Sequence, residues 1–108
     1  MNHHASGIDA MNRLGRALAD PTRSRILLTL LEKPSFPVDI AADLGLTRSN
    51  VSNHLTCLRD CGIVSIQPRG RKTLYTIATH EVEDILLHAQ RLVLHIDPTC
   101  ECDAGDKN

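Results

Sequence analysis

The sequence predicts a mainly α-helical domain that carries one β-hairpin, a fold of the α+β class. A short apolar helical segment, a turn that contains glycine and a second helical segment follow one another over residues 37–61. Two alternating, β-branched segments then flank "PRGRK" at 68–72, a proline- and glycine-containing turn between basic residues. This order is that of a winged helix-turn-helix. With 108 residues and 2% aromatic content, the chain can build one small aliphatic core, so we expect a single domain over residues 1–108.

Two helices are predicted before the helix-turn-helix. Residues 7–19 carry apolar side chains at helical spacing, namely Ile8, Met11, Leu14 and Leu18. The next helix begins after Asp20, whose side chain can cap it. Pro21 suits the first helical position because its missing N–H needs no partner there. The apolar stripe of this second helix is Ile26, Leu27, Leu30 and Leu31.

The helix-turn-helix is predicted from its capping residues, and a hairpin and a long helix follow it. Ser35 is expected to cap a short helix over residues 37–44, which Gly45 ends. Thr47 is expected to cap the second helix, which Gly62 closes. The segments "IVSIQ" and "TLYTIA" predict two strands. Residues 80–96 predict a long amphipathic helix with a broad apolar face, and residues 97–108 predict a polar tail.

Charge and motif content restrict the classes of function. No apolar run approaches the roughly 18 residues that span a membrane, and the N-terminus lacks the layout of a signal peptide. We therefore expect a cytoplasmic protein without a membrane partner. No nucleophile–base pair, phosphate loop or carboxylate pair stands out, which argues against an enzyme and against a small-molecule substrate. The formal net charge is −1, yet residues 41–80 hold five basic residues against two acidic ones, whereas residues 81–108 hold seven acidic residues against two basic ones. A polyanion would therefore bind the middle of the chain.

The second helix of the helix-turn-helix carries the side chains of a DNA-reading helix. On a wheel of about 100° per residue, Val51, Leu55 and Leu58 fall in a narrow arc that must face the core, and small polar side chains fall opposite. A face selected only for solubility would carry Glu and Lys, which form helices better than Ser and Asn. Ser, Thr, Asn and Arg can contact base edges and phosphates. A solvated face or a protein-binding surface is the alternative. The predicted DNA contacts are Thr47, Arg48, Ser49, Asn50, Ser52, Asn53 and His54 on this helix and Arg69, Arg71 and Lys72 on the hairpin.

Three stretches carry a resemblance to a known family. The segments "RALADPTRSRIL", "AADLGLTRSNVSNHLTCLRDCGIV" and "GRKTLYTI" resemble the ArsR/SmtB family of metal-responsive repressors, and the resemblance covers nearly the whole chain. It implies a homodimer, formed through the first and last helices, that binds operator DNA when metal-free and dissociates when metal binds. The wide apolar face of residues 82–96 independently favours a dimer. We therefore expect a DNA-reading core at about 20–79, a dimerisation helix at about 80–96 and a metal-binding tail at 97–108.

The four cysteines form a second pattern with chemical meaning. Cys57 and Cys61 are four residues apart on the DNA-reading helix. Cβ atoms at that spacing lie about 5–6 Å apart, so two thiolates can bind one ion without unwinding the helix. A disulfide across the same turn would be strained. Cys100 and Cys102 lie on the tail, which can reach the pair. Taken alone, the helix pair could also be small buried hydrophobic residues, but clustered cysteines in a reducing cytosol more often indicate metal binding or catalysis.

The cysteine pattern also resembles one branch of the family, the CmtR-type cadmium and lead sensors. That branch takes two cysteines from the recognition helix of one subunit and one from the C-terminal tail of the other, which implies Cys57, Cys61 and Cys102 as metal ligands. Cys100 departs from the branch, as a fourth ligand or a spare residue, and Ser24 stands where the branch tends to have a cysteine. A set of thiolates suits Cd(II) or Pb(II) as the effector. The alternatives are an As(III)/Sb(III) or Zn(II) sensor of the same family and a thiol-redox-responsive repressor.

A competing metal site is conceivable on the last predicted helix. Asp84, His88 and His95 fall in one stripe of that helix, so in an antiparallel dimer Asp84 and His88 of one subunit could approach His95 of the other. The zinc and nickel sensors of the family build sites in this region with Asp-x-His and His-x-x-His/Glu spacings, and this sequence has neither. We therefore expect solvated polar residues there, and a zinc site is the secondary hypothesis.

Overall fold

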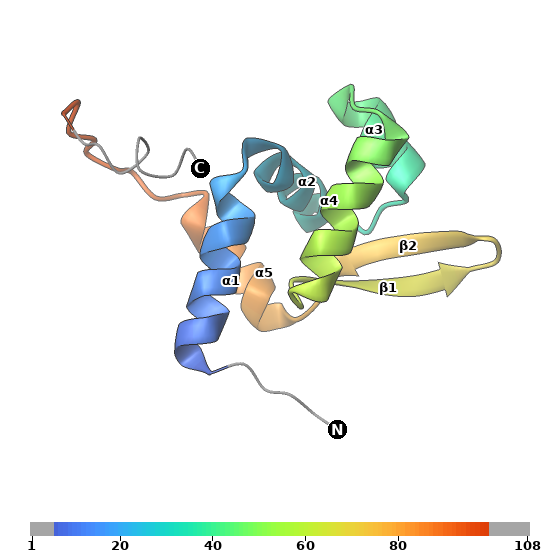
Figure 1. Ribbon diagram of the computed structural model, residues 1–108, viewed down its shortest axis with the longest axis horizontal. Helices are drawn as coiled ribbons and strands as arrows, with labels where there is room; N and C mark the ends of the chain where they lie inside the picture. The colour runs from blue at the N-terminus through green and yellow to red at the C-terminus, as the bar shows by residue number, and fades with distance from the viewer. Residues whose placement is uncertain (1–5, 100–108) are drawn as a thin grey trace.

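The computed structural model describes residues 6–99, which form five helices and one hairpin (Figure 1). The elements follow in the order α1 (Gly7–Ala19), α2 (Pro21–Glu32), α3 (Pro37–Leu44), α4 (Arg48–Asp60), β1 (Val64–Arg69), β2 (Lys72–Ile77) and α5 (His80–Ala89). This order confirms the predicted α+β class, with α3 and α4 as the helix-turn-helix and the antiparallel hairpin as its wing. The wing projects from one end of the molecule (Figure 1). None of the helices in this range is long and apolar enough to cross a membrane.

A single acidic residue joins the first two helices. Asp20 is both the C-cap of α1 and the N-cap of α2, as predicted for α2. Its Oδ1 accepts hydrogen bonds from the backbone N–H groups of Thr22 at 2.7 Å and Arg23 at 3.2 Å. The Arg23 guanidinium donates to two carbonyl oxygens near the end of α1, those of Arg16 at 2.7 Å and Ala17 at 3.2 Å. These two side chains therefore satisfy backbone groups that the two helix ends leave without partners.

The helix-turn-helix is attached to the wing where α3 begins. Ser35 does not cap α3 as predicted, because the N-cap is Phe36, which makes no side-chain capping bond. Ser35 is buried and instead exchanges two backbone hydrogen bonds with Tyr75 of β2: its N–H donates to the Tyr75 carbonyl at 3.0 Å, and its carbonyl accepts from the Tyr75 N–H at 2.9 Å. The local capping pattern could not reveal this partner, which lies far along the chain. These two hydrogen bonds attach strand β2 of the wing to the segment that leads into α3.

The turns of the helix-turn-helix and of the wing follow the prediction. Gly45 ends α3 in the left-handed conformation with a φ of 68°, which L side chains rarely adopt. The Thr47 Oγ1 then caps α4 by accepting from the Asn50 N–H at 3.0 Å. In the hairpin, Arg69 pairs with Lys72 across a two-residue turn whose first residue, Gly70, has a φ of 64°.

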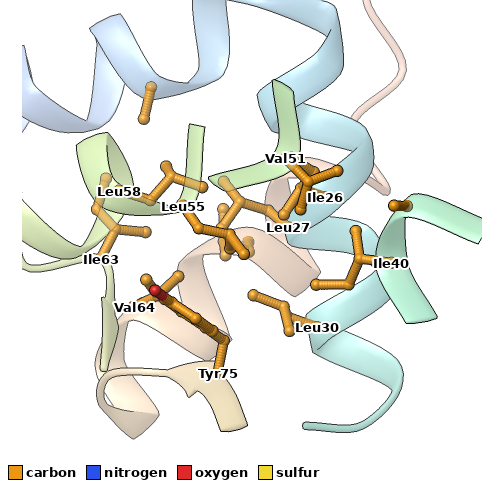
Figure 2. Packing of buried hydrophobic residues seen from close by; sticks show 13 residues of the cluster. Ile26, Leu27, Leu30, Ile40, Val51, Leu55, Leu58, Ile63, Val64 and Tyr75 are labelled. Atoms are coloured by element: carbon orange, nitrogen blue, oxygen red, sulfur yellow. The ribbon is translucent and has the colours of Figure 1, made fainter. Parts of the chain in front are cut away.

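The core is small and aliphatic, and α4 contributes its inner face to it. Figure 2 shows Leu55 and Leu58 pointing from α4 into a cluster with Ile26 and Leu27 of α2 and Val64 of β1. The three side chains predicted to face inward from α4 are fully buried, at 0% exposure each, and are Val51, Leu55 and Leu58. Because this face is fixed in the core, the polar face of α4 lies on the outside.

The last helix is shorter than predicted. α5 ends at Ala89, with Gln90 as its C-cap, so the expectation of a helix over 80–96 is wrong beyond residue 89. The apolar side chains that would have extended its face are 65–82% exposed and are Leu92, Val93, Leu94 and Ile96. Most helical stability in proteins comes from packing of an apolar face. Within the described part of one chain, these four side chains stay mostly exposed, although Leu94 lines a groove with Leu28, Leu31 and Leu86.

Candidate DNA interface and metal site

The outer face of α4 is polar and open to solvent. Six of the residues predicted to contact DNA from this helix and its cap are exposed, namely Thr47, Arg48, Ser49, Asn50, Ser52 and Asn53. The Thr47 hydroxyl oxygen accepts the capping hydrogen bond. This face can therefore offer hydroxyl, amide and guanidinium groups to a base edge or a phosphate.

A groove of about 340 Å³ brings the N-terminal half of α4 next to the wing. Its walls include Arg48 and Ser52 from α4, and Arg71 and Lys72 from the wing. Four predicted DNA contacts from two separate parts of the chain therefore line one groove. Three of them are cationic, which is the charge that a phosphate backbone requires. The start of α3 completes the groove with Phe36, Pro37 and Val38, which the sequence reasoning missed.

Six of the ten predicted contacts lie outside this groove, among them Arg69 and His54. Arg69 is exposed on β1, where its guanidinium donates to the Gln67 Oε1 at 2.8 Å. His54 is half-buried and lies close enough to Asp20 for its charge to act on that carboxyl. Burial raises the pKa of Asp20, but hydrogen bonds from Arg23 and Thr22 and the charges of Arg23 and His54 outweigh it and lower the pKa. His54 thus differs from the other predicted contacts on α4, because it is partly covered by the protein.

Cys57 and Cys61 lie one intact helical turn apart at the C-terminal end of α4. Cys61 is the C-cap and keeps helical dihedral angles, with a φ of −81° and a ψ of −7°. Its N–H donates to the Cys57 carbonyl at 3.0 Å. The two Cβ atoms are therefore about 5–6 Å apart, which is the spacing expected for two ligands of one ion. Both thiols are free; Cys57 is exposed and Cys61 is half-buried.

Cys61 lies where α4 meets α1 and α5. It lines a mostly apolar groove of about 240 Å³ together with Met11 and Leu14 of α1 and Val82 and Ile85 of α5. The two cysteines therefore have different surroundings: one faces solvent, and the other borders the helices predicted to form a dimer. A helical wheel of α4 alone could not predict this difference.

The described residues supply only part of a thiolate site. Cys100 and Cys102, the predicted tail ligands, lie outside the described residues. Between residues 6 and 99, no three His, Cys, Asp or Glu side chains come together to hold a metal ion. Cys57 and Cys61 thus offer two sulfur atoms, fewer than the four ligands that zinc takes in structural sites. Ser24 adds no ligand, and its hydroxyl donates to the Leu18 carbonyl at 3.1 Å.

The predicted stripe of Asp84, His88 and His95 does not form. All three side chains are exposed, but His95 lies beyond the end of α5, so it does not share a helix face with the other two. The prediction was wrong here because it required a helix that continues to residue 96. The secondary zinc site remains a hypothesis about the dimer.

Comparison with known proteins agrees with this geometry. The family model described as "Bacterial regulatory protein, arsR family" matches residues 20–65. The HTH-type transcriptional regulator CmtR of Mycobacterium bovis is 50% identical over 95 residues, which are 88% of this chain and 80% of that protein. The NMR structure of the cadmium metal-sensor CMTR from Mycobacterium tuberculosis superposes with a TM-score of 0.68 and 50% identity, covering 84% of this chain and 95% of that one.

A second solved structure supports the architecture. The homodimeric winged helix-turn-helix DNA-binding domain of Mb0332 from Mycobacterium bovis has a TM-score of 0.74 at 26% identity, covering 83% of this chain and 87% of that one. The family match lies over α2 to the start of β1, which includes the helix-turn-helix and both helix cysteines. This chain is therefore a winged helix-turn-helix transcription regulator and belongs to the ArsR family of bacterial regulatory proteins.

Proposed function

We propose that this protein is a metal-sensing transcriptional repressor, which binds operator DNA as a homodimer when metal-free and dissociates when Cd(II) or Pb(II) binds its cysteine thiolates. One observation carries the proposal: α4 holds both a solvent-exposed polar face and, at its C-terminal end, two free thiols one helical turn apart. A cation bound by those thiols is attached to the helix that would read the operator.

The DNA-binding part of the proposal rests on charge and shape. Arg48, Arg71 and Lys72 line one groove between α4 and the wing, where a duplex backbone would lie. A dimer with two-fold symmetry would present two such units to half-sites about one helical turn apart. Sequence-independent phosphate contacts of this kind make affinity fall steeply with salt concentration.

The homodimer rests on an apolar surface that one chain leaves uncovered. Ile8 and Met11 on α1 are 72% and 73% exposed, and Ile85 on α5 is 48% exposed. The apolar residues that follow α5 are exposed as well, namely Leu92, Val93, Leu94 and Ile96. Large exposed apolar patches mark interaction sites, and the Mb0332 domain, which shares this fold, is described as homodimeric. Met11→Glu should therefore shift the protein toward monomer in sedimentation, whereas Ile66→Glu on the wing should not.

The metal-binding part rests on the donor chemistry. Cys57, Cys61 and Cys102 are the proposed ligands, with Cys100 as an additional thiolate. Soft thiolates favour soft cations, and CMTR, with 50% identity to this chain, is named as a cadmium sensor. A bound cation supplies a cross-link between α4 and the tail. Because Cys61 lines a groove with residues of α1 and α5, ligation of its thiolate would act beside the proposed dimer surface.

Coupling between the metal site and the DNA-binding surface would have two measurable consequences. The thiols must lose their protons before they ligate, so metal affinity should fall as the pH is lowered. If metal weakens DNA binding, DNA must weaken metal binding by the same factor. The coupling free energy that corresponds to this factor is typically about 1–3 kcal/mol.

A titration with two readouts tests the proposal. Reduced protein is bound to a labelled duplex from its own promoter region, and Cd(II) is added while fluorescence anisotropy and ultraviolet absorption are recorded. We expect thiolate-to-metal absorption to rise to a stoichiometric endpoint as anisotropy falls. Absence of the absorption band would contradict the metal site. Loss of DNA binding with peroxide and without metal would favour the redox-responsive alternative, and parallel titrations with Pb(II), Zn(II) and As(III) rank the effectors.

A further inference from the structure

We propose that Phe36 is a positioning residue for DNA binding, whose ring holds the Lys72 ammonium group of the wing against the start of α3. The inference rests on the proposed DNA-binding function and adds to it a residue that acts through the Lys72 side chain. It explains why one of the two aromatic side chains of this chain lies next to the DNA-reading unit.

The contact has the geometry of a cation–π interaction. The Lys72 Nζ lies 5.4 Å from the centroid of the Phe36 ring, within the range of about 6 Å for such pairs. Neither helix capping nor core packing accounts for the ring, because Phe36 makes no side-chain capping bond for α3 and is not among the buried core residues. It is half-buried and lines the groove that Lys72 also lines.

The backbone beside the contact is already held in place. Ser35, the residue before Phe36, pairs with Tyr75. Tyr75 lies on β2, the strand that begins with Lys72. This bridge fixes the two backbones but not the long Lys72 side chain. A free lysine side chain loses rotamer entropy when it is immobilised. A side chain that is already restrained loses less rotamer entropy on binding. The Phe36 ring therefore lowers the entropic cost of a phosphate contact by Lys72.

The restrained ammonium group is placed to act with α4. Arg48 and Ser52 line the groove from the α4 side, and Arg71 and Lys72 line it from the wing. An ammonium group has three N–H donors, so it can remain over the ring and still donate to a phosphate oxygen. The ligand class is therefore the phosphate backbone of a duplex at the junction of α4 and the wing.

A double-mutant cycle tests the inference. Operator affinity is measured by anisotropy at one salt concentration for wild type, Phe36→Leu, Lys72→Gln and the double variant. We expect Phe36→Leu to weaken binding by about 2- to 5-fold and to have no further effect in the Lys72→Gln background. Phe36→Tyr keeps the ring and should bind like wild type. Arg71→Gln, in the same groove but not over the ring, should combine additively with Phe36→Leu.

The contact itself has a readout that does not require DNA. In wild type and Phe36→Tyr, the ring current should shift the Lys72 ε-methylene protons upfield in NMR spectra, and Phe36→Leu should abolish the shift. An equal loss of affinity from Phe36→Leu in the wild-type and Lys72→Gln backgrounds, or absence of the upfield shift in wild type, would overturn the positioning role alone. Failure of the wild-type protein to bind any duplex would overturn the proposed function and this inference with it.

Discussion

Replacing Asp20 tests the joint between α1 and α2 quantitatively. Asp20→Ala removes the acceptor for the Thr22 and Arg23 N–H groups, and loss of such an N-cap costs about 0.5–2 kcal/mol. It also removes an ion pair with Arg23 at 3.7 Å, in which the Asp20 side chain is 32% exposed. Partly exposed pairs of this kind contribute about 0–1 kcal/mol. We therefore expect the free energy of unfolding to fall by about 0.5–3 kcal/mol in total.

The charge of Asp20 adds a pH dependence. Although burial raises the pKa of this carboxyl, its hydrogen bonds and the neighbouring positive charges lower it below the ordinary value of 3.8. A carboxyl with a lowered pKa in the folded state contributes stability that is fully present above the unfolded-state pKa and is lost as pH falls through the folded-state pKa. Asp20→Asn keeps a capping oxygen and removes only the charge. The difference between wild type and Asp20→Asn should be constant near neutral pH and shrink below about pH 4.

Urea unfolding followed by circular dichroism measures both effects. All variants must be compared at one protein concentration, because the proposed homodimer would make the stability depend on it. Asp39→Ala is the matched control, since Asp39 is an exposed acid in the first turn of α3 and caps nothing. It should change the free energy of unfolding by less than about 0.5 kcal/mol. An equally small effect of Asp20→Ala would refute the capping argument.

Four further predictions concern the proposed sensor. Cys57→Ser and Cys61→Ser should each still bind operator DNA but no longer release it with Cd(II); normal release in both variants would remove the pair from the site. Cys102→Ser should weaken the Cd(II) response more than Cys100→Ser, and the opposite ranking would make Cys100 the main tail ligand. Arg48→Gln should weaken operator binding and reduce the slope of log affinity against log salt by about 1, whereas an unchanged slope would show that Arg48 contacts no phosphate. Addition of excess chelator to the Cd(II)-released protein should restore operator binding in an anisotropy assay, and failure to recover would point to irreversible thiol chemistry instead.

Features that depend on neighbouring residues were predictable from the sequence. The Asp20 and Thr47 caps were correct because each accepts a hydrogen bond from a residue two or three positions along the chain. The inward face of α4 followed from helical periodicity alone, as did the one-turn spacing of Cys57 and Cys61. Such signals are local, so a sequence contains both partners of each interaction within one short stretch.

Features that depend on distant contacts were not predictable. Ser35 was predicted to cap α3 from its place in the sequence. That prediction failed because its backbone pairs with Tyr75, which belongs to another element. The Phe36–Lys72 contact also joins distant residues. The half-burial of Cys61 depends on α1 and α5, which no wheel of α4 contains. The predicted extent of the last helix failed for a related reason, because a helix whose apolar side chains remain uncovered lacks the packing that would extend it.

Asp20 leaves no spare residue between α1 and α2, since it ends one helix and begins the next. Inserting or deleting one amino acid there would change the direction in which α1 leaves α2, because Asp20 is the single residue with extended dihedral angles between the two helices. Side chains such as Ile8 and Met11 would then aim in a new direction, while the reading unit itself stayed unaltered. The number of amino acids at this junction therefore bears on the orientation in which two copies could meet.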